Sequence, residues 1–210
     1  MRFLNKVLAE AKSNKPSFGR EYEIHAAKVT LYRGTKDILP SKIDHDRINN
    51  KGLWGPGTYL SPDPKVAAWY AFKDPEKFGV LVKYEVTNVK ILKLKTPSDF
   101  VYDEKGILFG GKIKLTKKGS SKLGLSGELE PEGMVEIARN AGYDAIEIDD
   151  TKRQSTYSEH MIILFTPGKL KPAEFSTRLW DQKTAKYIEH TTTKATQLDA
   201  IIKAGFSIRF

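Results

Sequence analysis

The chain contains no cysteine. This absence excludes a disulfide framework, a thiolate nucleophile and any zinc site with sulfur ligands, and it fits a reducing compartment. Long hydrophobic runs are also missing, because no stretch approaches the roughly 18–20 apolar residues that cross a bilayer. We therefore expect no membrane segment, and the N-terminus lacks the pattern of a secretion signal.

The composition is typical of a soluble globular domain of ordinary size, with 210 residues, of which 40% are hydrophobic and 29% charged. The formal net charge is +9, and a basic surface attracts polyanions such as nucleic acid, acidic proteins or a dinucleotide. A solvated lysine-rich surface is the other interpretation, because the lysines are dispersed. No arginine-rich arm is present, which argues against sequence-specific DNA reading.

Short, irregularly spaced strands and segregated helices predict an α+β fold. We expect strands over 28–33 (ended by Gly34), 58–60, 80–86, 89–94, 143–148 and 161–165. We expect helices over 64–72, 131–140 and 195–204, the first two with proline near the start. Glycine, serine and lysine over 117–127 predict a mobile loop.

The first candidate site segment is LYRGT, Leu31–Thr35. An arginine at a strand end can place a planar cation against a pyrophosphate, while the adjacent glycine lets a ligand approach the backbone. The alternative is a surface arginine in a turn. Arg33 and Gly34 are therefore candidate binding residues, together with Thr35.

The second segment, Gly52–Ala71, runs from a glycine-rich turn through a short strand into an alanine-rich helix. Tyr59 and Tyr70 lie eleven residues apart across this junction. Two tyrosines so placed form the walls of a slot for a flat ring, unless both are simply core aromatics.

The third segment, Tyr143–Pro172, places Glu159 where a polar loop enters an apolar strand. A carboxylate there suits stabilisation of a positive charge, although an exposed glutamate at a strand end is the alternative.

Taken in this order, the three segments resemble the ADP-ribosyltransferase superfamily over Val29–Lys171. The resemblance implies two small, roughly perpendicular β-sheets that form an NAD cleft with flanking helices. NAD is then the substrate, and no metal is needed.

The same resemblance implies the role of each site residue. Arg33 holds the phosphates or a ribose, and the Gly34 backbone pairs with the nicotinamide amide. Tyr59 and Tyr70 enclose the nicotinamide ring, with Thr35 and Ser61 also in the cofactor site. Glu159 stabilises the oxocarbenium ion, so Glu159, Tyr59 and Arg33 form the catalytic set.

The chain departs from the family pattern at several positions. Arg33 is typical of the arginine–serine–glutamate members of the superfamily. The spacing of eleven residues between the two tyrosines is typical of its poly-ADP-ribose polymerase branch. Ala67 replaces a small hydroxyl residue that bonds the nicotinamide amide. Glu159 lies two residues before the usual place of the catalytic glutamate, and Glu147 is the next candidate. Tyr157 replaces a second glutamate found in members that modify arginine, so arginine is disfavoured as the acceptor.

The N-terminal MRFLNKVLAEA predicts a short amphipathic helix, with Phe3, Leu4, Val7 and Leu8 on one face. It resembles the capsid-targeting leaders of internal head proteins in T-even-like phages, which the prohead protease removes. Cleavage would then fall between Glu10 and Ala11. An ordinary first helix is the alternative. The resemblance implies a protein of the phage capsid interior that later enters the host cytoplasm.

The two resemblances together imply a monomeric, NAD-dependent mono-ADP-ribosyltransferase that is packaged with phage DNA, which its basic surface contacts, and that is injected to modify a host protein or RNA. We expect a leader over 1–10, a linker over 11–27, the transferase domain over 28–172 and an extension over 173–210 that packs on the domain. Two alternatives stay open. One is hydrolysis of NAD, or transfer to nucleic acid, at the same site. The other is a non-catalytic head protein that keeps the fold as a scaffold and binds a host factor or DNA.

Overall fold

The computed structural model describes residues 23–26, 28–50, 52–74, 77–95, 99–102, 113–124, 127–130, 133–149, 160–166, 168–181 and 183–206. The expected leader with its Glu10–Ala11 junction lies outside the described residues, and so do Tyr157 and Glu159. None of the described helices is long and apolar enough to span a membrane.

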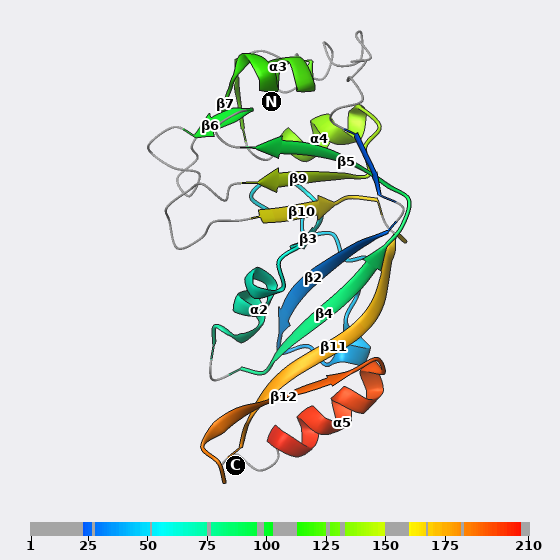
Figure 1. Cartoon of the computed structure of the whole chain (residues 1–210), viewed down its shortest axis with the longest axis vertical. Helices are drawn as coiled ribbons and strands as arrows, with labels where there is room; N and C mark the ends of the chain where they lie inside the picture. Colours follow the sequence, from blue (N-terminus) through cyan, green and yellow to red (C-terminus); the bar gives the residue numbers. More distant parts are fainter. Residues whose placement is uncertain are drawn as a thin grey trace. The chain divides into compact units, whose positions relative to one another are not determined.

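The described strands form three sheets, with five, four and three strands (Figure 1). The strands are β1 (Glu23–Ala26), β2 (Val29–Lys36), β3 (Thr58–Leu60), β4 (Gly79–Val86), β5 (Val89–Lys95), β6 (Phe100–Tyr102), β7 (Ile113–Leu115), β8 (Glu128–Leu129), β9 (Ala145–Asp149), β10 (His160–Leu164), β11 (Leu170–Asp181) and β12 (Lys186–Thr192). The helical elements are η2 (Pro40–Lys42), α2 (Pro64–Phe72), α3 (Lys117–Leu123), α4 (Gly133–Asn140) and α5 (Ala195–Phe206). The predicted α+β class is confirmed.

The chain divides into two compact units. The first unit takes in Met1–Ala27, Arg47–Tyr59 and Thr87–Pro167. The second unit takes in Lys28–Asp46, Leu60–Val86 and Gly168–Phe210. The sequence therefore crosses between the units several times, and the second unit combines residues 28–46 with residues near the C-terminal end of the described chain.

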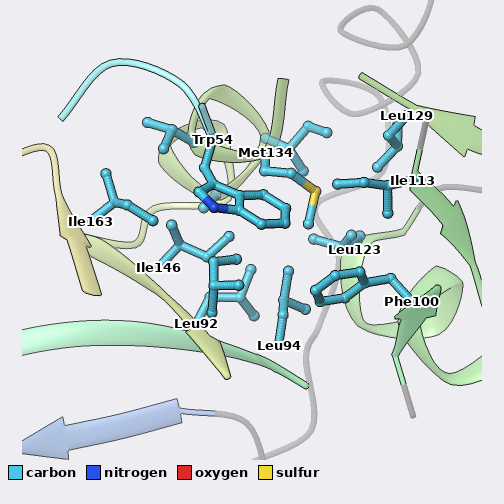
Figure 2. Packing of buried hydrophobic residues seen from close by; sticks show 14 of the residues in the cluster. Trp54, Leu92, Leu94, Phe100, Ile113, Leu123, Leu129, Met134, Ile146 and Ile163 are labelled. Carbon is cyan, nitrogen blue, oxygen red and sulfur yellow. The ribbon is translucent and has the colours of Figure 1, made fainter. Parts of the chain in front are cut away.

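The core of the first unit lies against one face of the five-stranded sheet, whose order is β1-β5-β9-β10-β3. Alternate residues of β5, β9 and β10 point to this face because side chains in a strand alternate. They pack with residues of α3, α4 and the three-stranded sheet, as Figure 2 shows. Fully buried members of this cluster include Leu92, Leu94, Phe100, Met134 and Ile146.

The second unit is built on a four-stranded antiparallel sheet of order β12-β11-β4-β2. Helix α2 packs on one face, which we call the α2 face. A Cβ atom at Gly79 would overlap the Ala71 carbonyl and lie 2.8 Å from Phe72 Cδ1. Helix α5 packs on the opposite face, where Gly205 lies against the Leu179 side chain.

Two expectations from the sequence are wrong. The segment over 117–127 begins with helix α3, whose N-cap Thr116 accepts a hydrogen bond from the Gly119 amide and whose C-cap Gly124 is left-handed. These cap residues are a helix signal that the flexible composition concealed. Gly34 does not end its strand, because β2 continues to Lys36 and pairs with β4 throughout.

Candidate functional site

The candidate cofactor residues of the second unit gather around β2, the end strand of its sheet. Tyr32 N–H donates to the Ser61 carbonyl and Ser61 N–H donates to the Tyr32 carbonyl, both at 2.8 Å. These bonds lie on the outer edge of β2. In an antiparallel strand every second residue directs its backbone groups to the same side. The N–H and C=O of Gly34, two residues beyond Tyr32, therefore also point to the outer edge.

Helix α2 covers this part of β2 closely. A Cβ atom at Gly34 would overlap the Ala67 carbonyl oxygen and lie 2.6 Å from the Ala71 nitrogen. The helix begins beside the strand because Ser61 Oγ accepts a hydrogen bond from Asp63 N–H at 3.0 Å, and Asp63 caps the helix. Gly34 and Ser61, two of the predicted residues, thus lie where the strand and the helix approach.

Tyr70 lies on an exposed part of α2, where 38% of its surface is accessible. Its ring meets the edge of Trp69 with 4.9 Å between centroids. The Lys73 ammonium lies 5.3 Å from the Tyr70 ring centroid. The ring therefore belongs to a surface group of two aromatics and one cation, and it is not a core residue.

Arg33 points to the opposite sheet face from Gly34, because neighbouring side chains in a strand alternate. Its Nη1 donates to the Asp44 carbonyl at 3.3 Å. On the same face lies the fully buried Tyr84, whose hydroxyl is 2.8 Å from His45 Nδ1. Burial raises the pKa of Tyr84 to about 12. Burial, with the nearby Arg33 charge, lowers the pKa of His45. Sequence reasoning identified Arg33 but missed the His45–Tyr84 pair, because no motif marks it.

The remaining two predicted site residues, Thr35 and Tyr59, differ in their hydrogen bonding and in the unit to which they belong. Thr35 Oγ1 is buried and has no hydrogen-bond partner among the described residues. Tyr59 belongs to the first unit, whereas Arg33, Gly34, Thr35, Ser61 and Tyr70 belong to the second. The Tyr59 hydroxyl accepts from Trp54 N–H at 2.9 Å and donates to the Gly55 carbonyl at 2.8 Å. It therefore orders the glycine-rich turn that precedes β3.

A buried ionic cluster in the first unit was not predicted from the sequence. Glu147 on β9 is only 6% exposed. Its Oε2 lies 3.0 Å from Lys93 Nζ, and its Oε1 lies 2.8 Å from His160 Nε2. Burial acts to raise the pKa of Glu147, but the hydrogen bonds and charges of His160 and Lys93 outweigh it and lower that pKa. The hydrogen bond to Glu147 raises the pKa of His160.

Strand register brings these three residues together. The parallel pairing of β5 with β9 puts Lys93 opposite Glu147. The antiparallel pairing of β9 with β10 puts His160 opposite Asp149. Asp149 lies two residues after Glu147 on β9 and therefore on the same sheet face. Charged residues alternate with apolar ones in VKILKLK and AIEID, which is the signal that marks this face. The cluster ties three strands together through one carboxylate.

We predict that His160→Gln lowers the free energy of unfolding by about 1 kcal/mol at pH 6 and by less at pH 9. The folded-state pKa of His160 is raised, so its stabilisation is complete below the ordinary pKa and disappears as pH rises through the folded value. For Glu147 the pKa is lowered, so its contribution disappears as pH falls through the folded value. Urea denaturation at both pH values measures the difference.

The matched control is the same substitution in a Glu147→Gln background. There the pH dependence of the His160→Gln cost should shrink, since Glu147, the largest cause of the raised histidine pKa, is gone. A pH-dependent cost of equal size in both backgrounds would contradict the assigned contact.

Comparison with known proteins gives little further information. No family model matches the chain, and neither does any curated protein. Among solved structures, the chain is similar to one in the crystal structure of the M. tuberculosis MbcT–MbcA toxin–antitoxin complex, with 14% sequence identity and a TM-score of 0.44. The alignment covers 96% of this chain and 99% of that chain. A likeness of this size does not assign a family or an activity.

Proposed function

We propose that the protein is a mono-ADP-ribosyltransferase that uses NAD as its substrate. The observation that carries this proposal is the outward-pointing N–H and C=O of Gly34 on the edge of β2, beside the bridge between Tyr32 and Ser61. A primary carboxamide such as that of nicotinamide has one acceptor oxygen and an N–H₂ donor. A single residue at a strand edge satisfies both groups.

The cation needed for the cofactor is Arg33. Its contact with the Asp44 carbonyl is 3.3 Å long, whereas charge-assisted hydrogen bonds are about 2.7–2.9 Å. A guanidinium has five donors, so Arg33 retains donors for a phosphate or a ribose hydroxyl. Thr35 Oγ1, buried without a partner among the described residues, adds a hydroxyl to the same strand. We propose that Ser61 also lies in this cofactor site.

The remaining roles follow from the family resemblance. Tyr70 stacks on the nicotinamide ring, and Tyr59 belongs to the catalytic set. As the bond between nicotinamide and ribose breaks, the Glu159 carboxylate stabilises the oxocarbenium ion. Nicotinamide leaves with the bonding electron pair. The acceptor then bonds to the ribose carbon and loses its proton.

We further propose that the transferase is a phage-encoded effector, packaged in the head and injected into the host. The helical spacing of the apolar residues Phe3, Leu4, Val7 and Leu8 in the sequence, followed by the Glu10–Ala11 junction, supports this setting. The acceptor is then a host protein or RNA.

Incubation of the full chain with NAD labelled in its adenylate half, with and without host lysate, tests the proposal. Release of nicotinamide with label in protein or RNA supports transfer. Label only in free ADP-ribose would support the hydrolase alternative. No nicotinamide release under either condition would reject the enzyme and favour the non-catalytic head protein.

We predict that Tyr70→Ala weakens NAD binding by about tenfold, while Tyr70→Phe weakens it far less. The face of an aromatic ring provides the stacking energy, which is worth about 0.5–1.5 kcal/mol beyond burial. Isothermal titration with NAD measures both. Equal losses in the two variants would show that the hydroxyl, and not the ring, is responsible.

A further inference from the structure

The described part of the chain exposes four aromatic rings, and all belong to the second unit: Trp69, Tyr70, Trp180 and Tyr187. Trp180 on β11 and Tyr187 on β12 are directly opposite in the strand register. Their ring centroids are 5.1 Å apart in an edge-to-face arrangement. Yet Trp180 is 41% exposed and Tyr187 is 53% exposed. A cross-strand aromatic pair stabilises a hairpin, but this pair leaves much of its ring surface in solvent.

The rings share a face with cations. Arg178 lies two residues before Trp180, so both point to the α2 face. The Arg178 guanidinium is 4.8 Å from the ring of Phe72 on α2. Lys73, the C-cap residue of α2, has its ammonium 4.3 Å from the Trp69 ring. The Arg178–Phe72 contact therefore links the β11–β12 hairpin to helix α2, and a second contact between a cation and a ring lies at the C-terminal end of that helix.

The carboxylates near the hairpin are already engaged. Asp181 accepts hydrogen bonds from Lys183 N–H at 3.1 Å and Thr184 Oγ1 at 2.7 Å, which order the turn. Glu189 pairs with Arg178 at 3.2 Å. Lys183 is exposed in the turn next to the aromatic pair, whereas the exposed Lys186 pairs with Asp181 and so points to the opposite sheet face. The hairpin thus presents exposed rings with a lysine at its tip, in a chain of net charge +9.

We propose that the α2 face at the β11–β12 hairpin binds single-stranded nucleic acid. Unpaired bases stack on Trp180 and Tyr187, while Lys183 in the hairpin turn contacts the phosphates. Base–aromatic stacking tolerates any base, and lysine contacts add an affinity that falls with salt. A duplex conceals its base faces, so this surface discriminates against it. The surface requires no NAD and is independent of the proposed catalytic residues.

The test is fluorescence anisotropy with a labelled 12-nucleotide oligo-uridine and oligo-thymidine, without NAD, at several salt concentrations. We expect binding by the wild-type chain that quenches tryptophan fluorescence and weakens as salt rises. Trp180→Ala should weaken binding about tenfold, in line with about 1–3 kcal/mol per stacked base. Trp180→Phe should retain most of the affinity, because a ring remains.

The matched control is Ile188→Ala. Ile188 is 42% exposed on the same hairpin, but it pairs with Leu179 and so points to the opposite sheet face. It should leave binding unchanged, and circular dichroism checks that each variant is folded. No binding of either oligonucleotide, or equal affinity for a duplex, would overturn the proposal. So would a Trp180→Ala chain that is folded and binds like the wild type. Because NAD is absent, these outcomes are independent of the transferase assay.

Discussion

Replacing Glu159 with glutamine is expected to reduce NAD turnover by about 100-fold or more while leaving NAD affinity nearly unchanged. The proposed role of this carboxylate is to stabilise a positive charge that exists only as the bond to nicotinamide breaks. Glutamine keeps the shape and hydrogen-bonding capacity but removes the charge. Nicotinamide release under saturating NAD, together with isothermal titration, separates the two effects.

Glu147→Gln is the control that tests whether Glu159 or Glu147 is the catalytic carboxylate. Glu147 is buried and holds both Lys93 and His160, so its neutral replacement leaves two cationic groups without their carboxylate. We expect a loss of about 2 kcal/mol in stability, visible as a lower melting temperature. If Glu159→Gln turns over normally, and a folded Glu147→Gln chain does not, the catalytic carboxylate is Glu147.

Local signals allowed the sequence to predict some elements closely. Helix α2 has the predicted bounds, because Asp63 at the cap, Pro64 in the first turn and the alanines that follow all favour a helix. Strands β4 and β5 lie within one residue of the predicted ranges 80–86 and 89–94, and Asn88 in the turn between them has a φ of 54°. Asparagine tolerates this left-handed conformation better than most residues.

Elements that depend on distant partners were harder to predict. Strand β11 pairs with β4, whose partner residues lie 84 (Leu170 to Val86) to 97 (Thr177 to Val80) positions earlier in the chain, and a register shift between Pro172 and Glu174 interrupts its alternation. No pattern within residues 168–192 specifies that partner. The Glu147 cluster is similar, since it exists only because two strand pairings align Lys93 and His160 with one carboxylate. The individual charges were visible in the sequence, but the registers were not.

Gly34 illustrates how a predicted site residue also has a packing role. The sequence suggested that this glycine allows a ligand to approach the backbone. The fold gives it a second role, because α2 lies so close that any side chain there meets the Ala67 carbonyl and the Ala71 nitrogen. A functional test at Gly34 must therefore distinguish lost packing from lost binding.

Gly34→Ala is expected to destabilise the second unit by about 3 kcal/mol. Inserting a methyl group into a tightly packed contact typically costs about 1–3 kcal/mol. The upper value applies at Gly34 because the contacting atoms belong to the backbone and cannot rotate away. Gly79→Ala meets the same helix at the Ala71 carbonyl and should cost a similar amount. Urea denaturation followed by tryptophan fluorescence measures both.

Gly168→Ala provides the contrast within the same unit. Gly168 has a φ of 76°, and nothing lies within 4 Å of the position of an added Cβ. Its substitution costs only the left-handed backbone penalty, about 1 kcal/mol. If packing against α2 is the reason for glycine at position 34, the loss in Gly34→Ala and Gly79→Ala exceeds that in Gly168→Ala. If NAD also binds at the β2 edge, Gly34→Ala loses more affinity than an equally destabilised Gly79→Ala, because only Gly34 displays its amide and carbonyl there. Equal NAD affinity in these two variants would remove Gly34 from the cofactor site while leaving its packing role intact.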